Sequence, residues 1–100
     1  MVKHMIIWKL KEMSPEALEA QKKLVKEGLE GLAGKIPGMT HIHVQTENLP
    51  TSNGDMMLDS TFVDAEALAG YSIHPEHVHV ANTYIRPYIE TRLCLDYEEE

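Results

Sequence analysis

Hydrophobic and polar residues alternate at the start of the chain, which predicts a β-strand over residues 2–10. One face of this strand would carry Val2, His4, Ile6, Trp8 and Leu10, and the other face Lys3, Met5, Ile7 and Lys9. Because Met5 and Ile7 make the second face half apolar, it is more hydrophobic than a sheet with one wet face requires. We therefore expect both faces of the strand to be covered.

A helix is predicted to follow over residues 15–33. Ser14 and Pro15 give the N-cap and first-turn signal, and apolar residues then recur at helical spacing. These residues are Leu18, Val25, Leu29 and Leu32. Gly34 fits the C-cap of this helix, and the Ile36-Pro37-Gly38 sequence predicts a turn after it.

The rest of the chain predicts three more strands and a divided helical region. The strands are expected over residues 40–45, 56–62 and 90–97, and the helices over residues 65–70 and from Pro75 to about Pro87. In the second of these helices Val80, Tyr84 and Tyr88 would share one face. Residues 47–55 are rich in Asn, Thr, Ser and Gly and predict a loop.

The predicted order β-α-β-β-α-β is that of the ferredoxin-like α+β fold, an antiparallel four-stranded sheet with helices on one face. A chain of 100 residues suits one such domain over residues 1–100. Its ordered core is expected over residues 1–97, with residues 98–100 as an acidic, solvated tail.

Composition excludes several classes of partner. Nine Lys and Arg against sixteen Asp and Glu give a formal net charge of −7, the opposite of what phosphate-backbone binding needs. No stretch approaches the ~20 apolar residues of a membrane span, and the N-terminus starts a strand pattern instead of a signal peptide. We therefore expect a cytoplasmic protein without nucleic-acid or membrane partners. Cys94, the one cysteine, is expected to be a buried, inert thiol.

Candidate chemistry concentrates in residues 71–79, where Tyr71, His74, His77 and His79 lie close together in the sequence. A histidine moves protons near neutral pH, and a tyrosine hydroxyl donates a hydrogen bond to a developing oxyanion. His77 would thus be a general base and Tyr71 its oxyanion partner. Alternatively, the two side chains bond to each other or to the backbone and serve only structure. His4 has the same two interpretations, as a catalytic group or as a satisfied core histidine.

His74 precedes Pro75, and we expect its side chain to cap the helix that begins there. The three histidines do not predict a metal site, because His79 lies about 200° around the helix from His77 at 100° per residue. No cysteine or carboxylate completes a zinc site in this segment. We expect neither a metal nor a cofactor.

Several motifs together resemble the stress-responsive alpha/beta-barrel domain (Dabb) family. They are the Lys3-His4 opening strand, Ile36-Pro37-Gly38, the segment Tyr71-Ser72-Ile73-His74-Pro75-Glu76-His77-Val78, and the closing Leu93-Cys94-Leu95-Asp96-Tyr97. The resemblance runs over nearly the whole chain, and the HPxHV core of the third motif is its most specific part. It implies a homodimeric alpha/beta barrel in which two sheets face each other and the helices lie outside.

The resemblance also implies a site. The family includes a plant polyketide cyclase in which a His/Tyr pair drives an aldol condensation within a cavity, and Tyr71, His77 and His4 stand at the matching places. In this chain Met56 replaces a further cavity histidine, and Trp8 replaces a smaller aliphatic residue. Residues expected to line the cavity are Ile6, Trp8, Val25, Leu29, Met56, Leu58, Val80 and Tyr84.

Three functions remain open. The first is a small cofactor-independent enzyme that abstracts a proton beside a carbonyl of an apolar substrate and promotes aldol-type cyclisation or elimination. The second is a non-catalytic dimer that is stress-associated or binds a small apolar ligand. The third, drawn from fold analogy alone, is a monooxygenase-like barrel. A ligand-sized cavity that exposes both Tyr71 and His77 would favour the first, and closure of that space by Trp8 would weaken it.

Overall fold

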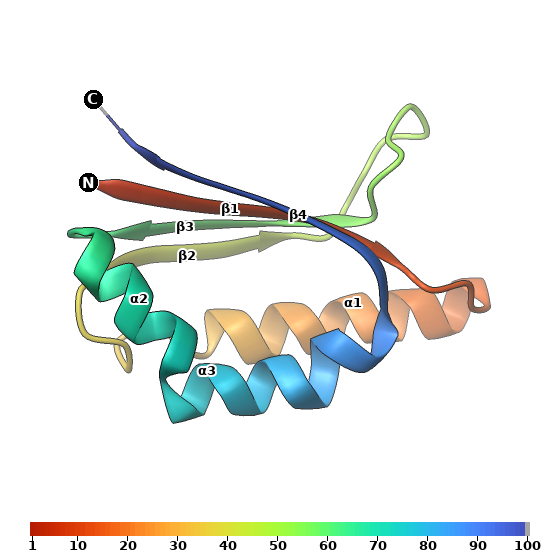
Figure 1. The fold of residues 1–100 in the computed structure, drawn as a ribbon. Coiled ribbons are helices and arrows are strands. Elements are labelled where there is room, and N and C mark those ends of the chain that lie inside the picture. Colours follow the sequence, from red (N-terminus) through yellow and green to blue (C-terminus); the bar gives the residue numbers. More distant parts are fainter. Residues whose placement is uncertain (100) are drawn as a thin grey trace.

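A computed structural model describes residues 1–99 of the chain. The elements follow the order β1 (Val2–Leu10), α1 (Pro15–Glu30), β2 (Met39–Gln45), β3 (Met56–Phe62), α2 (Ala65–Ile73), α3 (Pro75–Val80), η1 (Ala81–Ile85), η2 (Arg86–Tyr88) and β4 (Ile89–Glu98). The strands form one antiparallel sheet in the order β2-β3-β1-β4, with the helices gathered on one of its faces (Figure 1). The predicted ferredoxin-like α+β fold is confirmed.

The hydrophobic core lies between the sheet and the helices. In β1 the predicted alternation holds, since Val2, Ile6, Trp8 and Leu10 are all buried on the helix side. Val25 and Leu29 of α1 complete this layer and are almost fully enclosed. Burying an aliphatic or aromatic side chain contributes roughly 1.5–3 kcal/mol each, so this layer dominates the stability of the fold.

The opposite face of the sheet carries no helix and is markedly apolar. Ile7 of β1 is 47% exposed, and Leu93, Leu95 and Tyr97 of β4 are exposed beside it. Register places these side chains together, because Ile7 pairs with Leu93 and Met5 with Leu95. The loop over residues 46–55 rises on the same side of the sheet (Figure 1). We call the exposed set Ile7, Leu93, Leu95 and Tyr97 the bare sheet face.

Helix α1 begins as predicted, with the Ser14 hydroxyl accepting from the N–H of Ala17 at 3.2 Å. Its regular part ends at Glu30, three residues before the expected end. Leu32 and Ala33 then form tighter turns, in which each N–H donates to the carbonyl three residues before it. Gly34, at φ 81°, provides the left-handed residue that stops the helix.

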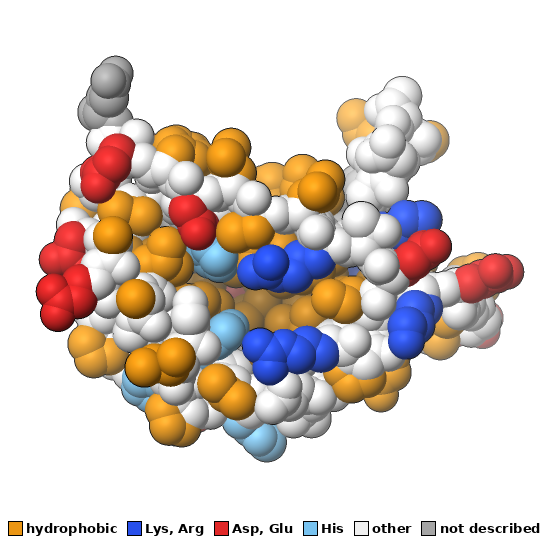
Figure 2. Space-filling model, viewed as in Figure 1, with side chains coloured by type: hydrophobic (Ala, Val, Ile, Leu, Met, Phe, Trp, Pro, Cys, Tyr) orange, Lys and Arg blue, Asp and Glu red, His pale blue; other side chains and the backbone are white. Residues whose placement is uncertain are grey.

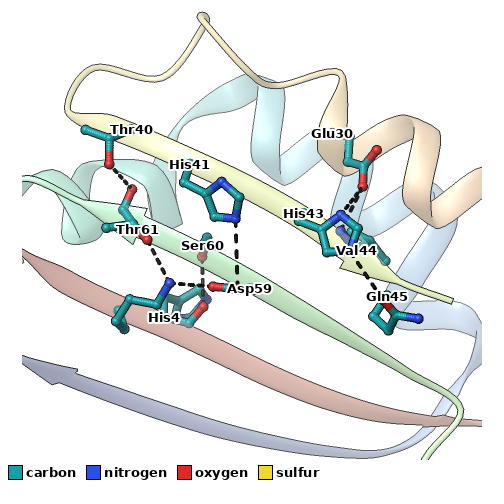
Figure 3. A network of polar contacts seen from close by, with 11 residues as sticks. His4, Glu30, Thr40, His41, His43, Val44, Gln45, Asp59, Ser60 and Thr61 are labelled. Carbon is teal, nitrogen blue, oxygen red and sulfur yellow. Dashed lines mark hydrogen bonds and ion pairs between the residues drawn. The ribbon is translucent and has the colours of Figure 1, made fainter. Parts of the chain in front are cut away.

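Side chains of α1 hydrogen-bond to the free backbone groups along the outer edge of β2. Glu30 Oε2 accepts from the N–H of Val44 at 2.8 Å (Figure 3). Lys26 Nζ donates to the Val44 carbonyl at 2.8 Å. Lys26 and Glu30 also pair with each other at 2.8 Å. An unpaired strand edge invites association with other strands, so this arrangement both fixes α1 and protects the edge.

The segment before β4 differs from the prediction of one regular helix. After α3 the chain forms a π-helical turn, Ala81–Ile85, and then a 3-10 turn, Arg86–Tyr88. The wide turn changes which residues face the core: Ala81 and Ile85 are buried, whereas Tyr84 is half-buried and Tyr88 is exposed. Gln21 of α1 donates to the Tyr84 carbonyl at 2.6 Å and so satisfies a backbone group of the altered turn.

The expectation that Cys94 is buried is wrong. Cys94 is exposed, because β4 is an edge strand whose residues from Glu90 onward are all exposed. Partial desolvation by its neighbours and the adjacent Asp96 raise the pKa of its thiol, against a smaller opposing effect of Arg92, so the thiol stays protonated near neutral pH.

The C-terminal strand extends further than the core predicted over residues 1–97. β4 includes Glu98, and the N–H of Glu99 donates to the Met1 carbonyl at 2.9 Å. Glu100, the last residue of the expected acidic tail, lies outside the described residues. Across residues 1–99 no helix has the length and apolar character needed to cross a bilayer.

Candidate active site

A cavity of about 90 Å³ lies between the sheet and the helices. Its lining comes from every layer of the fold and comprises His4, Ile6, Trp8, Leu29, Leu58, Tyr71, Ser72, His77, Ala81, Ile85, Arg86, Ile89 and Arg92. Figure 2 shows a hollow between the sheet and helix layers with an apolar interior, and with basic and histidine side chains at its rim. The space is several times what one water molecule needs.

Tyr71 lies near the end of α2 and is 2% exposed. Its ring packs against Phe62 of β3, with centroids 5.2 Å apart. Burial raises the pKa of Tyr71 well above its ordinary value, although the charge of Arg92 works in the opposite direction. The phenol is therefore protonated at neutral pH and has a proton available for a hydrogen bond. Among residues 1–99 its hydroxyl has no hydrogen-bond partner, yet it is not among the fully enclosed polar atoms.

His77 lies in α3 and stacks on Tyr71, with ring centroids 4.1 Å apart. Its Nδ1 lies 3.3 Å from the Ser72 carbonyl. Since a carbonyl only accepts, Nδ1 carries the proton, which leaves Nε2 of the neutral ring as a free base. Desolvation lowers the pKa of His77, and the charges of Arg86, His4 and Arg92 lower it further against the opposing Ser72 hydrogen bond. The neutral, basic form is thus favoured at pH 7.

His4 reaches the same cavity from β1. Its ring meets Tyr71 edge-on at a centroid distance of 5.9 Å. Nδ1 of His4 lies 2.5 Å from Oδ1 of Asp96, which holds the orientation of a buried imidazole. The sequence analysis missed Asp96. The pairing of β1 with β4 could have revealed it, because the two strands are neighbours in this fold and Asp96 lies directly opposite His4.

Among residues 1–99, His4, Cys94 and Asp96 are the one group of three or more His, Cys, Asp or Glu whose donor atoms could share a metal ion, all lying within 4.8 Å of one another. Two nitrogen or oxygen ligands of a tetrahedral zinc ion lie about 3.3 Å apart, given bonds of about 2.0 Å. The shorter distance between His4 and Asp96 is that of a hydrogen bond. As arranged, the group orients His4.

The cavity includes part of the lining expected from sequence. Ile6, Trp8, Leu29 and Leu58 line it. Val25, Met56, Val80 and Tyr84 do not: Val25, Met56 and Val80 are buried elsewhere in the core, and Tyr84 packs partly buried against that core. Trp8 does not fill the space, and its Nε1 is buried without a hydrogen-bond partner among residues 1–99.

The other two histidines of the segment lie apart from this site. His74 Nδ1 accepts from the N–H of Glu76 at 3.1 Å, which caps α3. His79 is exposed. A larger, open hollow of about 430 Å³ lies on the opposite face of the sheet, between Ile7, Met57 and the 46–55 loop. It contains neither histidine nor tyrosine and borders the bare sheet face.

Both arginines of the cavity also went unnoticed in the sequence. Arg92 lies on the helix-facing side of β4, directly opposite Trp8, and Arg86 lies in η2. Isolated arginines carry no motif, and only the folded chain brings them to one rim.

Fold and site together define a ferredoxin-like protein with a Tyr/His cavity between sheet and helices. The chain belongs to the stress-responsive A/B barrel domain family, Dabb, whose family model matches residues 2–99. The resemblance noted from the sequence motifs is confirmed. No functionally curated protein is similar enough to count as a match.

Solved structures agree with this assignment. A dimeric protein of unknown function with a ferredoxin-like fold from Bacteroides fragilis is 30% identical, with a TM-score of 0.91 over 98% of this chain and 95% of that one. A protein from Arabidopsis thaliana is 27% identical, with a TM-score of 0.74 over 100% and 96% of the two chains. A putative antibiotic biosynthesis monooxygenase from Nitrosomonas europaea is 13% identical, with a TM-score of 0.76 over 99% and 98%, a similarity of fold alone.

Proposed function

We propose that this protein is a cofactor-independent enzyme that removes a proton from the carbon beside a carbonyl group and promotes aldol-type closure or elimination. The observation that carries the proposal is the pair in the cavity: a histidine whose pKa is lowered, stacked on a tyrosine whose pKa is raised. A base and an acid at one site, each in the form its role needs at neutral pH, suit enolate chemistry.

Nε2 of His77 is the base in this proposal. It takes the proton from the α-carbon, and the electron pair of that C–H bond becomes the enolate. The Tyr71 hydroxyl donates a hydrogen bond to the enolate oxygen. The enolate carbon then attacks a second carbonyl of the same substrate, a C–C bond forms, and the proton on His77 passes to the new alkoxide. Loss of water from that aldol is the elimination.

His4 and Asp96 act as a positioning pair. The carboxylate accepts from Nδ1 of His4 and fixes the ring whose edge meets Tyr71. A fixed His4 restricts the Tyr71 ring to one orientation, and such restriction makes an oxyanion donor effective without reorganisation during the reaction.

Exchange of α-protons for deuterium tests the proposal without knowledge of the natural substrate. Small ketones, diketones and oxo acids are incubated with the protein in D₂O, and loss of the α-proton signal is followed by NMR. We expect exchange with at least one of these probes, and about 10²-fold less in His77→Gln. His79→Gln is the matched control, because it removes an exposed histidine two residues away.

Exchange that is equal in both histidine variants, or absent throughout the panel, contradicts the catalytic proposal. The protein would then be a non-catalytic binding protein, the alternative that the sequence also left open.

We also propose that the protein is a homodimer joined through its bare sheet faces. The support is the exposure of Leu93, Leu95 and Ile7 on one surface that no helix covers. The Bacteroides fragilis structure is described as dimeric. Two facing sheets would form the dimeric alpha/beta barrel for which the family is named.

A further inference from the structure

Both arginines of this chain lie at one place. The sequence contains only Arg86 and Arg92, and both line the cavity that holds Tyr71 and His77. They come from different layers, Arg92 from β4 of the sheet and Arg86 from the η2 turn of the helical layer. Figure 2 shows basic side chains on both sides of the hollow. Two guanidinium groups thus border one small space from opposite walls.

Neither arginine has a carboxylate partner. Within residues 1–99 the ion pairs of the side chains involve Lys3, Lys22, Lys23, Lys26 and three histidines, and no pair includes an arginine. Arg86 donates to the neutral amide oxygen of Asn82 at 2.5 Å. In a chain with seven more acidic than basic residues, acidic partners are abundant. Both arginines are exposed and have no carboxylate partner within residues 1–99, so both guanidinium groups are available to bind an anionic ligand.

One carboxylate on the same side of β4 is already engaged. Asp96 projects from the same side of β4 as Arg92, four residues further along, but its Oδ1 accepts from His4. Arg86 and Arg92 line the same cavity as Tyr71 and His77. A ligand held in that cavity by the arginines would therefore lie against the Tyr71/His77 pair.

We propose that the substrate is a small oxo acid that carries a second carbonyl, with its carboxylate bound between Arg86 and Arg92 and the carbonyl that becomes the enolate beside Tyr71. This inference rests on the proposed function and names the substrate class of the same site. A planar guanidinium matches a planar carboxylate through two parallel hydrogen bonds. Between the charged rim and the polar pair, Ile6, Leu58 and Ile85 offer an apolar surface for a short carbon chain. The arginines also offset the second negative charge that forms when the bound acid becomes an enolate.

The test compares the affinity of each charged oxo acid with that of its uncharged methyl ester. Binding of 3-oxobutanoate, 4-oxopentanoate and 5-oxohexanoate, and of their methyl esters, is measured by calorimetry and by NMR shifts of Tyr71 and His77. We expect at least one acid to bind ten- to a hundredfold more tightly than its ester, as charge-assisted hydrogen bonds worth about 1.5–3 kcal/mol require. Arg92→Gln and Arg86→Gln should each lose about tenfold in acid affinity and leave ester affinity unchanged.

Lys23→Gln is the control for net charge, because it removes one exposed positive charge on α1. Acid affinity that falls equally in Lys23→Gln and the arginine variants overturns the proposal. So does equal binding of acids and esters, or no binding of any acid at millimolar concentration. Inorganic phosphate that binds more tightly than every acid also overturns it, since the site would then recognise phosphate.

Binding and turnover separate this inference from the proposed function. Tyr71→Phe should keep acid affinity within about twofold and lose proton exchange, because it retains the ring and removes only the donor. Arginine-dependent binding without exchange would contradict catalysis and support the anion site. If neutral ketones exchange their α-protons at a rate that neither arginine substitution changes, the result would support catalysis and contradict the anion site.

Discussion

Tyr71 and His77 contact each other through their ring faces, with centroids 4.1 Å apart and planes inclined by 35°. They do not hydrogen-bond to each other, which is one of the two structural arrangements expected from the sequence, the other being a bond to the backbone. The imidazole instead bonds to the Ser72 carbonyl, and the phenol hydroxyl has no partner among residues 1–99.

This geometry predicts different effects on stability and activity for Tyr71→Phe. Removal of the hydroxyl breaks no described hydrogen bond, so the free energy of unfolding should change by less than about 0.5 kcal/mol. Proton exchange should fall about 10²-fold if Tyr71 holds the oxyanion. Denaturant unfolding and the D₂O assay measure the two effects. A variant that loses 1 kcal/mol or more and keeps its activity per folded molecule would show that the hydroxyl is structural.

The pH dependence of activity should follow His77. Its lowered pKa means that the basic form accumulates as pH rises through a value below 6.5, so kcat/KM should reach its plateau at a lower pH than a histidine of ordinary pKa would give. No descending limb from Tyr71 is expected below its ordinary pKa of 10.0, which burial raises. NMR titration of the His77 ring gives the same pKa without substrate. A midpoint above 6.5 would contradict the assignment.

Stability should also depend on this histidine. Because the folded state binds a proton at His77 less readily than the unfolded chain, protonation favours unfolding as pH falls below 6.5. His77→Gln should remove this contribution, so its unfolding free energy should decline less between pH 7 and pH 5 than that of the native protein. His79→Gln, which changes an exposed ring, should decline as the native protein does.

The bare sheet face should determine the oligomeric state. A homodimer of this kind should bury at least about 1,200 Å² in total. Leu95→Glu places a charge at the centre of that face and should convert the dimer to a monomer in light scattering at micromolar concentration. Leu24→Glu is the matched control, since Leu24 is also exposed, at 43%, but lies on α1. A native protein that is monomeric at this concentration would exclude the barrel.

Two glycines with almost the same backbone conformation allow the cost of a left-handed backbone to be measured apart from the cost of a steric clash. Gly34 and Gly38 have φ of 81° and 80°, but only at Gly38 would a Cβ collide, 2.5 Å from Cβ of Ala67. Gly34→Ala should cost about 1–2 kcal/mol, from the left-handed backbone alone. Gly38→Ala should cost roughly 1–3 kcal/mol more, since α2 must shift to accept the methyl group. Equal midpoints of thermal unfolding would refute this difference.

The sequence by itself determined the fold and the central pair. Alternation in residues 2–10 and 56–62, helical spacing after Ser14 and the turn residues between them specify local structure through short-range sterics and hydrogen bonds. The Tyr71-to-His77 segment places a phenol and an imidazole around one helix start, and it supplied the most specific of the motifs that carried the family resemblance. Such features depend on residues that are close together in the chain, so they can be predicted from the sequence.

Only the tertiary structure decided what surrounds that pair. Asp96 reaches His4 across 92 residues of sequence, through the register of β1 and β4. The π-helical turn moved Ile85 into the core in place of Tyr88, and Arg86 and Arg92 met at one rim. Cys94, which alternation suggested was buried, is exposed because nothing covers the edge strand β4. Edge position, register and turn width follow from the packing of distant segments, and a one-dimensional pattern of residues does not contain them.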